Sequence, residues 1–216
     1  GMKRCYLVRH AQTVWNDENR IQGHSDVPLS PLGVKQAERL GVCFASRHVK
    51  GLFTSALQRS QRTAQAIADG NGHGVSPVVE QDLAEIHLGE WEGLTPDEVD
   101  ARFQRAYQQW RVLPSSVVIP GGEPLEAFRD RVRRAVERVM AGVGEGEYVL
   151  VTHGGVIAAL LADVLGANYD RVLRRVRLDN AGVTALDFIT ELPHVVWINS
   201  TTHLEALAPS TGVTWF

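Results

Sequence analysis

The chain has 216 residues, which fits one domain, and 44% of its residues are hydrophobic, which is enough for a sizeable core. Its formal net charge of −3 argues against a nucleic-acid-binding protein, because such a protein needs a basic surface. The longest apolar stretch, residues 156–165, is too short to span a bilayer. The two cysteines, Cys5 and Cys43, lie far apart and are expected to be free thiols of a reducing compartment. We therefore expect a cytoplasmic protein with no membrane partner.

The first part of the chain alternates short apolar runs with helical patterns. Residues 5–8 predict a buried strand that ends at Arg9 and His10. Ser30 and Pro31 predict a helix start, as N-cap and first helical residue. The packing face of this helix is expected to comprise Val34, Ala37, Leu40, Gly41 and Phe44. A strand over 51–55, a helix over 59–68 and a loop over 70–74 follow.

The second part continues the alternation. The segment 95–98 is a capping box with proline in its first turn, which predicts a helix that runs to about Trp110. A turn at 120–122 precedes a helix over 124–140, and an apolar helix after His153 stops at Gly166. The inward residues of the helix over 124–140 are expected to be Phe128, Val132, Ala135, Val136 and Val139. With strands over 148–152, 183–188 and 195–199, the pattern predicts an α/β fold.

Two of these strands end directly in a histidine, His10 and His153. Ligands of open α/β sheets bind beyond the carboxyl ends of the strands. If the two strands are parallel neighbours, both histidines meet there. Arg9 offers a planar fork that matches two phosphate oxygens, and a neutral imidazole is a good nucleophile. Taken alone, an Arg-His pair after a strand also fits a structural role.

Three further residues suggest phosphate chemistry. Arg59 lies at a strand-to-helix junction, where anions are favoured, although a surface arginine would fit equally well. His153 precedes two glycines that let backbone N–H groups approach a ligand, and a cationic His153 could donate to a phosphoryl oxygen. Glu85 could protonate a leaving group, but Glu90 and Glu92 are rival carboxylates that spacing alone does not separate.

Together these motifs resemble those of the histidine phosphatase superfamily, also called phosphoglycerate mutase-like. The segments that match, in the family's order, are 7–16, 23–30, 55–60, 85–93, 121–123 and 152–155. The resemblance covers nearly the whole chain. It implies a three-layer sandwich with a mostly parallel central sheet and helices on both faces. It also implies a single domain over residues 2–216, with a helical lid inserted at about 95–120.

The resemblance implies a role for each site residue. His10 would be the nucleophile that is transiently phosphorylated. Arg9, Arg59 and His153 would hold the phosphoryl group, and Glu85 would be the acid and later the base that activates water. The residues that would help to bind phosphate or substrate are Asn16, Gln22, Gly23 and Gly154. No metal and no cofactor is implied, because arginines and histidines supply the positive charge that Mg²⁺ supplies in kinases.

The sequence favours a phosphatase over a cofactor-dependent phosphoglycerate mutase. Such mutases carry an aromatic residue and a lysine where this chain has Leu88 and Pro96, and a longer basic insertion between the positions of Trp110 and Pro120. Ala11 replaces the usual glycine after the nucleophile. A non-catalytic phosphate-binding scaffold is a third interpretation, but it would have no need for a nucleophile, a clamp and a proton donor together.

The expected partner is a small phosphorylated metabolite, in a monomer or a homodimer. The physiological ester is left open, because no motif identifies it. Whether His24 contacts substrate is also open. The same holds for three arginines on or after the expected lid helix, for which a solvated helix face is the preferred interpretation: Arg102, Arg105 and Arg111.

Overall fold

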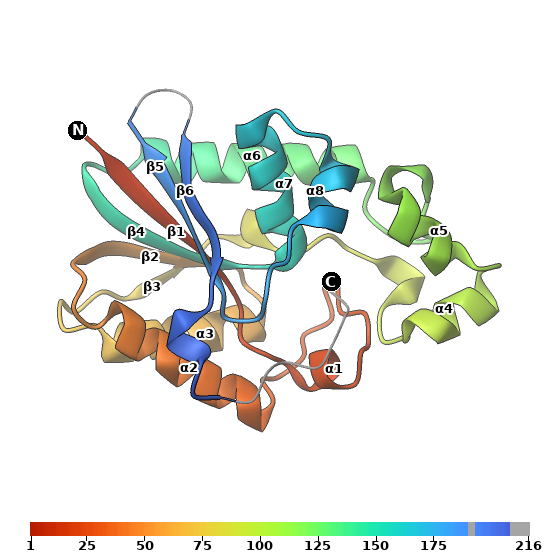
Figure 1. Ribbon diagram of the computed structural model, residues 1–216, viewed down its shortest axis with the longest axis horizontal. Helices are drawn as coiled ribbons and strands as arrows, with labels where there is room; N and C mark the ends of the chain where they lie inside the picture. Colours follow the sequence, from red (N-terminus) through yellow and green to blue (C-terminus); the bar gives the residue numbers. More distant parts are fainter. Residues whose placement is uncertain (190–192, 208–216) are drawn as a thin grey trace.

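The centre of the molecule is a six-stranded sheet (Figure 1), in a computed structural model that describes residues 1–189 and 193–207. The strands are β1 (Lys3–Arg9), β2 (Val49–Thr54), β3 (Pro77–Val79), β4 (Gly146–Thr152), β5 (Val183–Phe188) and β6 (His194–Ser200). Their order is β3-β2-β4-β1-β5-β6. The first four strands of this order are parallel to one another, whereas β5 is antiparallel to both of its neighbours. The sheet is therefore mostly parallel, as predicted.

Helices cover both faces of the sheet (Figure 1). The helices are α1 (Val14–Asp17), α2 (Pro31–Phe44), α3 (Gln58–Gly70), α4 (Pro96–Arg102), α5 (Ala106–Val112), α6 (Leu125–Ala141), α7 (Gly154–Leu165) and α8 (Tyr169–Arg175). α2 and α3 lie on one face, and α6 and α7 lie on the other. The predicted three-layer α/β sandwich is confirmed.

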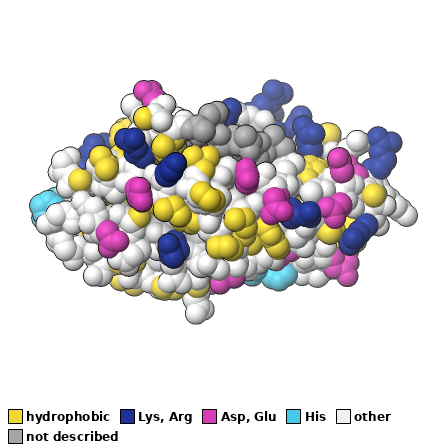
Figure 2. All heavy atoms as spheres, turned by 90° about the horizontal axis from the view of Figure 1, so that it is seen from below, with side chains coloured by type: hydrophobic (Ala, Val, Ile, Leu, Met, Phe, Trp, Pro, Cys, Tyr) yellow, Lys and Arg dark blue, Asp and Glu magenta, His cyan; other side chains and the backbone are white. Residues whose placement is uncertain are grey.

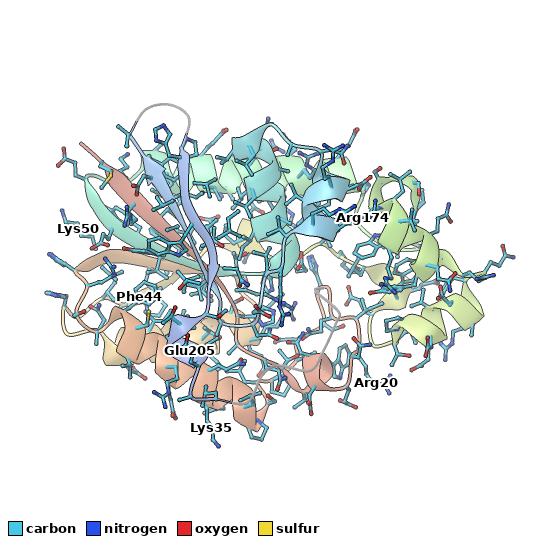
Figure 3. All side chains as sticks on the ribbon, viewed as in Figure 1. Arg20, Lys35, Phe44, Lys50, Arg174 and Glu205 are labelled. Atoms are coloured by element: carbon cyan, nitrogen blue, oxygen red, sulfur yellow. The ribbon has the colours of Figure 1, made fainter. Side chains whose placement is uncertain are left out.

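Strand alternation builds a separate core on each face. Cys5 and Leu7 of β1 pack in the core that α6 and α7 complete, whereas Tyr6 packs with α2 and α3 on the opposite face. Figure 3 shows that Phe44 of α2 points toward the sheet and Lys35 points away from it. The amphipathic pattern of the helices therefore places the sheet between two apolar layers.

Local sequence signals located several element ends correctly. The Ser30 hydroxyl accepts a hydrogen bond from the Gly33 N–H over 3.0 Å, and so caps α2 as predicted. Gly166 ends α7 with a φ of +60°, a backbone conformation that glycine adopts at little cost. The predicted inward residues of α6 are all buried: Phe128, Val132, Ala135, Val136 and Val139.

The helix expected from 95 to 110 is wrong in extent, because it breaks after α4. Gln104 and Arg105 have φ angles of +52° and +63°, which no helix interior tolerates. The Asp100 carboxylate accepts hydrogen bonds from the N–H groups of Tyr107 and Gln108, over 2.9 and 3.1 Å. Asp100, which lies in α4, thereby caps the second helix, α5. Periodicity alone does not reveal this break, because both helices keep an apolar face.

Other differences are smaller. Val34 is 39% exposed and so lies outside the packing face of α2, which instead buries Gln36. Gly70 belongs to α3 rather than to the following loop. The sequence reasoning missed β3, α1 and α8, which have only three, four and seven residues.

The surface carries charges of both signs. Figure 2 shows the molecule from below, where Lys and Arg side chains are interspersed with Asp and Glu. Among the helices that the structure describes, none combines the length and the apolar character that a membrane crossing requires.

Candidate active site

The two histidines expected to meet do lie side by side. β1 and β4 are parallel, with Arg9 paired to Thr152, so each histidine follows its strand at the same edge of the sheet. The His10 N–H donates to the Thr152 carbonyl over 3.0 Å, which extends the pairing by one step. The ring centroids of His10 and His153 are 5.1 Å apart. The strand pairing thus brings both rings to the same edge of the sheet.

His10 is held in the form that a nucleophile requires. Its Nδ1 lies 2.8 Å from the Ala11 carbonyl, which can only accept, so Nδ1 carries the ring proton and Nε2 keeps its lone pair. The residue is 2% exposed. Burial, with the positive charges of Arg59 and Arg9, holds the pKa of His10 well below its usual 6.5. The ring is therefore neutral at neutral pH.

Two buried arginines flank this ring. Arg9 Nη1 donates to the Leu178 carbonyl over 2.6 Å. Arg59 donates from Nη1 to the Ser25 carbonyl and from Nη2 to the Gly23 carbonyl, both over 2.7 Å. Burial lowers the pKa of each guanidinium to about 10, so both remain charged at neutral pH. The carbonyl oxygens orient the Arg59 guanidinium but carry no full negative charge, so they do not neutralise it. The positive charge of Arg59 therefore favours a bound anion.

One ring nitrogen of His153 has no hydrogen-bond partner among the described residues. Its Nε2 lies 2.7 Å from the Ser55 hydroxyl and 3.2 Å from the Ser60 hydroxyl, and its buried Nδ1 has no hydrogen bond. If the hydroxyls donate to Nε2, the ring proton lies on Nδ1. Burial and the charge of Arg59 hold the pKa of His153 well below 6.5. The cationic form expected from the sequence therefore needs a bound anion to stabilise it.

The structure separates the three rival carboxylates. Glu85 is 1% exposed, and its two oxygens accept from the N–H groups of Ile86 and Gly155, over 2.9 and 3.0 Å. Burial raises the pKa of Glu85 from 4.5 to about 6, against the opposing effect of these N–H groups and the arginines. Glu92 instead accepts from the backbone of the 23–25 loop and from Leu88, and Glu90 is exposed. Only Glu85 lies among the site residues.

The predicted binding residues lie in segments that contact or adjoin the histidines and Arg59. The Thr13 hydroxyl donates to Gln22 Oε1 over 2.6 Å, and the Thr13 N–H donates to Asn16 Oδ1 over 3.0 Å. The buried Gln22 Nε2 has no partner among the described residues. Gly23 has a φ of +53° and presents its carbonyl to Arg59, and Gly154 is the first residue of α7. Two amide groups and a helix N-terminus therefore join the histidines and arginines.

Sequence reasoning missed several supporting residues. Ser55 and Ser60 lie in the motif around Arg59, which is the available signal, but two serines alone do not indicate a contact with His153. Asn180 donates to the His10 carbonyl over 3.2 Å, and nothing in its local sequence marks it. Arg131 of α6 donates to the Glu85 carbonyl over 3.2 Å. The last two contacts join residues 170 and 46 positions apart, which a local pattern does not reveal.

The structure places the residues whose contact with substrate the sequence left open. His24 Nε2 donates to the Glu85 carbonyl over 2.7 Å, so His24 lies at the edge of the site. The three arginines of the 95–120 segment are exposed, which agrees with a solvated helix face: Arg102, Arg105 and Arg111. Ala11 lies outside the residues with positive φ in the described chain, so its methyl group causes no strain there.

Residues 5–201 match the model of the histidine phosphatase superfamily (branch 1). The chain belongs to this superfamily. Its curated relatives include "Putative phosphoserine phosphatase 2" of Hydrogenobacter thermophilus, 32% identical over 95% of this chain and 100% of that protein. The 2-carboxy-D-arabinitol-1-phosphatase of Triticum aestivum is 37% identical over 86% of this chain, which spans only 37% of that longer protein.

Other relatives carry mutase names. "Probable phosphoglycerate mutase GpmB" of Yersinia enterocolitica is 33% identical over 87% of this chain and 86% of that protein. Among solved structures, Bacillus stearothermophilus YhfR is 29% identical, with a TM-score of 0.88 over 94% of this chain and 100% of that chain. The fold is therefore that of the family, and the relatives' names span phosphatases and mutases.

Proposed function

We propose that the protein is a phosphomonoester hydrolase that acts on small phosphate esters through a phosphohistidine, without a metal ion. The observation that carries this proposal is the state of His10. This ring is buried, neutral and protonated on Nδ1, beside the guanidinium groups of Arg9 and Arg59. A nucleophile is thus held where a phosphoryl group would find positive charge.

In the first step, His10 Nε2 attacks phosphorus as the bond to the leaving oxygen breaks. The Glu85 carboxyl, with its pKa near 6, gives its proton to that oxygen. Arg9 and Arg59 balance the charge of the phosphoryl oxygens, and Nδ1 of His153 donates to one of them. The products are the free alcohol and phosphorylated His10, which keeps its proton on Nδ1.

In the second step, the Glu85 carboxylate removes a proton from water, which attacks phosphorus. The bond from phosphorus to His10 Nε2 breaks, and its electron pair returns to the ring. Inorganic phosphate leaves, and both residues regain their initial protonation states. One carboxyl group therefore serves as acid and then as base.

A phosphoglycerate mutase is the second candidate, favoured by the names of some relatives. Leu88 supports the phosphatase instead, because its side chain is buried in the core rather than offered to substrate. Pro96 is the first residue of α4 and carries no amine for a substrate carboxylate. We also propose that residues 2–216 form one domain, in which the helices of the 95–120 segment act as the lid.

The test is phosphate release from a panel of monophosphate esters with EDTA present. The panel includes 3-phosphoglycerate with and without 2,3-bisphosphoglycerate. Release from one or a few esters supports the phosphatase. Interconversion of 2- and 3-phosphoglycerate with little free phosphate would replace it with the mutase.

A further inference from the structure

Arg131 lies in α6, outside the motifs that supply the proposed chemistry, yet it contacts the segment that carries Glu85. We propose that Arg131 is a positioning residue that fixes the proton donor against the phosphoryl site. This inference rests on the proposed function and extends it to a residue that touches no substrate. It is carried by the contacts of the Arg131 guanidinium with the main chain.

The guanidinium binds three main-chain carbonyls within the four residues that lead to Glu85. Nη1 donates to the carbonyls of Asp82 and Ala84, over 2.7 and 2.8 Å, and Nη2 donates to the Glu85 carbonyl over 3.2 Å. The Glu123 carboxylate fixes the orientation of the Arg131 guanidinium, because it accepts hydrogen bonds from Arg131 Nε over 2.9 Å and from Arg131 Nη2 over 2.8 Å. All five contacts use the planar geometry of arginine, which a lysine does not reproduce.

The Glu85 segment needs such support. The short 3₁₀ helix η1 (Gln81–Leu83) ends just before it, and residues 84–88 lie in no helix or strand. No ladder of backbone hydrogen bonds therefore fixes the main chain at Glu85. Side chains supply the contacts instead, since His24 Nε2 also donates to the Glu85 carbonyl over 2.7 Å. The location of the proton donor is set by tertiary contacts.

The same contacts connect the proton donor to the phosphate clamp. His24 follows Gly23, whose carbonyl accepts from Arg59. The Glu85 carbonyl thus receives hydrogen bonds both from α6 and from the loop that orients the clamp arginine. A shift of about 1 Å in the donor would cost about 10²-fold in the proton-transfer step.

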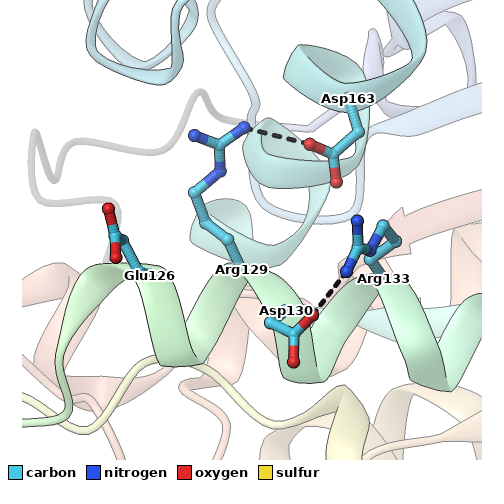
Figure 4. A pocket seen from close by; sticks show the side chains of 5 residues that line it. All are labelled: Glu126, Arg129, Asp130, Arg133 and Asp163. Carbon is cyan, nitrogen blue, oxygen red and sulfur yellow. Dashed lines mark hydrogen bonds and ion pairs between the residues drawn. The ribbon is translucent and has the colours of Figure 1, made fainter.

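Neighbouring arginines of α6 provide matched controls. Figure 4 shows a surface pocket in which Arg129 pairs with Asp163 and Arg133 pairs with Asp130. Arg133 is only two residues from Arg131 but faces solvent, and its ion pair with Asp130 lies on the helix surface. Arg133→Met therefore removes a charge from the same helix without touching the Glu85 segment.

The experiment compares kcat/KM for an alkyl phosphate, whose leaving group needs a proton, with that for p-nitrophenyl phosphate, whose leaving group barely does. We expect Arg131→Met to lower the alkyl-to-aryl ratio by about 10²-fold, and Arg131→Lys by about tenfold. Arg133→Met should leave the ratio unchanged. Thermal melting of each variant reports its folding. If Arg131→Met does not fold, the alkyl-to-aryl ratio is measured in Arg131→Lys and Glu123→Gln instead.

If Arg131 had a purely structural role, its variants would lower kcat/KM equally for the alkyl and the aryl ester. An unchanged alkyl-to-aryl ratio in the folded variants would therefore overturn the proposal. The double variant Glu85→Gln/Arg131→Lys should match Glu85→Gln alone in this ratio, because no proton donor is left to position. Failure of the proposed function has a different signature. In that case the wild-type protein releases no phosphate from either ester, or His10→Ala retains the wild-type rate.

Discussion

Protonation of Glu85 is expected to set the rate with poor leaving groups. Its pKa is raised to about 6, so the folded protein keeps this proton to higher pH than an ordinary carboxyl group does. The protonated fraction is high at pH 5 and falls tenfold per pH unit above 6, which gives a loss of about 100-fold between pH 5 and pH 8. The pKa of His10 lies well below 6.5, so neutral His10 persists through most of this range.

The assay follows kcat/KM from pH 5 to pH 8 for an alkyl phosphate and for p-nitrophenyl phosphate. This parameter reports steps up to departure of the leaving group, so the hydrolysis of phosphohistidine does not affect it. Ionisation of the substrate phosphate affects both esters similarly and largely cancels in their ratio. We expect the alkyl-to-aryl ratio to fall by about 100-fold as Glu85 loses its proton.

Glu85→Gln removes the proton but keeps the size of the side chain. We expect it to lower kcat/KM for the alkyl ester by about 10²–10³ at pH 6, to affect the aryl ester far less, and to make the ratio independent of pH. Glu90→Gln, which changes an exposed carboxylate nearby, should leave the wild-type profile intact. A ratio that is flat in the wild type, or that still falls in Glu85→Gln, would refute the assignment of Glu85 as the acid.

His10→Ala should abolish turnover and leave the circular dichroism spectrum unchanged; activity above about 1% of wild type would remove His10 from the nucleophile role. EDTA should not change the rate, and a loss that added Mg²⁺ or Zn²⁺ restores would contradict a metal-free mechanism. Gly23→Ala should lower the free energy of unfolding by about 1–3 kcal/mol, because φ is +53° and a Cβ would lie 2.3 Å from Glu92 Oε2. Gly72→Ala, at an open position, should change the urea midpoint little, and equal midpoints for both variants would show the clash to be harmless.

Much of the fold could be predicted because its signals are local. The N-cap at Ser30, the left-handed stop at Gly166 and the apolar stripe of α6 each depend on neighbours within a few residues. The break between α4 and α5 could not be predicted, because it depends on where the Asp100 carboxylate folds back to accept N–H groups. β3 was missed because three residues are too few for periodicity to show.

The sequence by itself determined that His10 and His153 each follow a buried strand, and the parallel pairing of these strands brings both histidines to one edge of the sheet. Only the tertiary structure decided among the three carboxylates, because burial against Gly155 and the arginines is a long-range property. It also decided the tautomer of His10, through the direction of the Ala11 carbonyl. Hydrogen bonds need specific distances and angles, and residues distant in sequence acquire these only once the chain has folded.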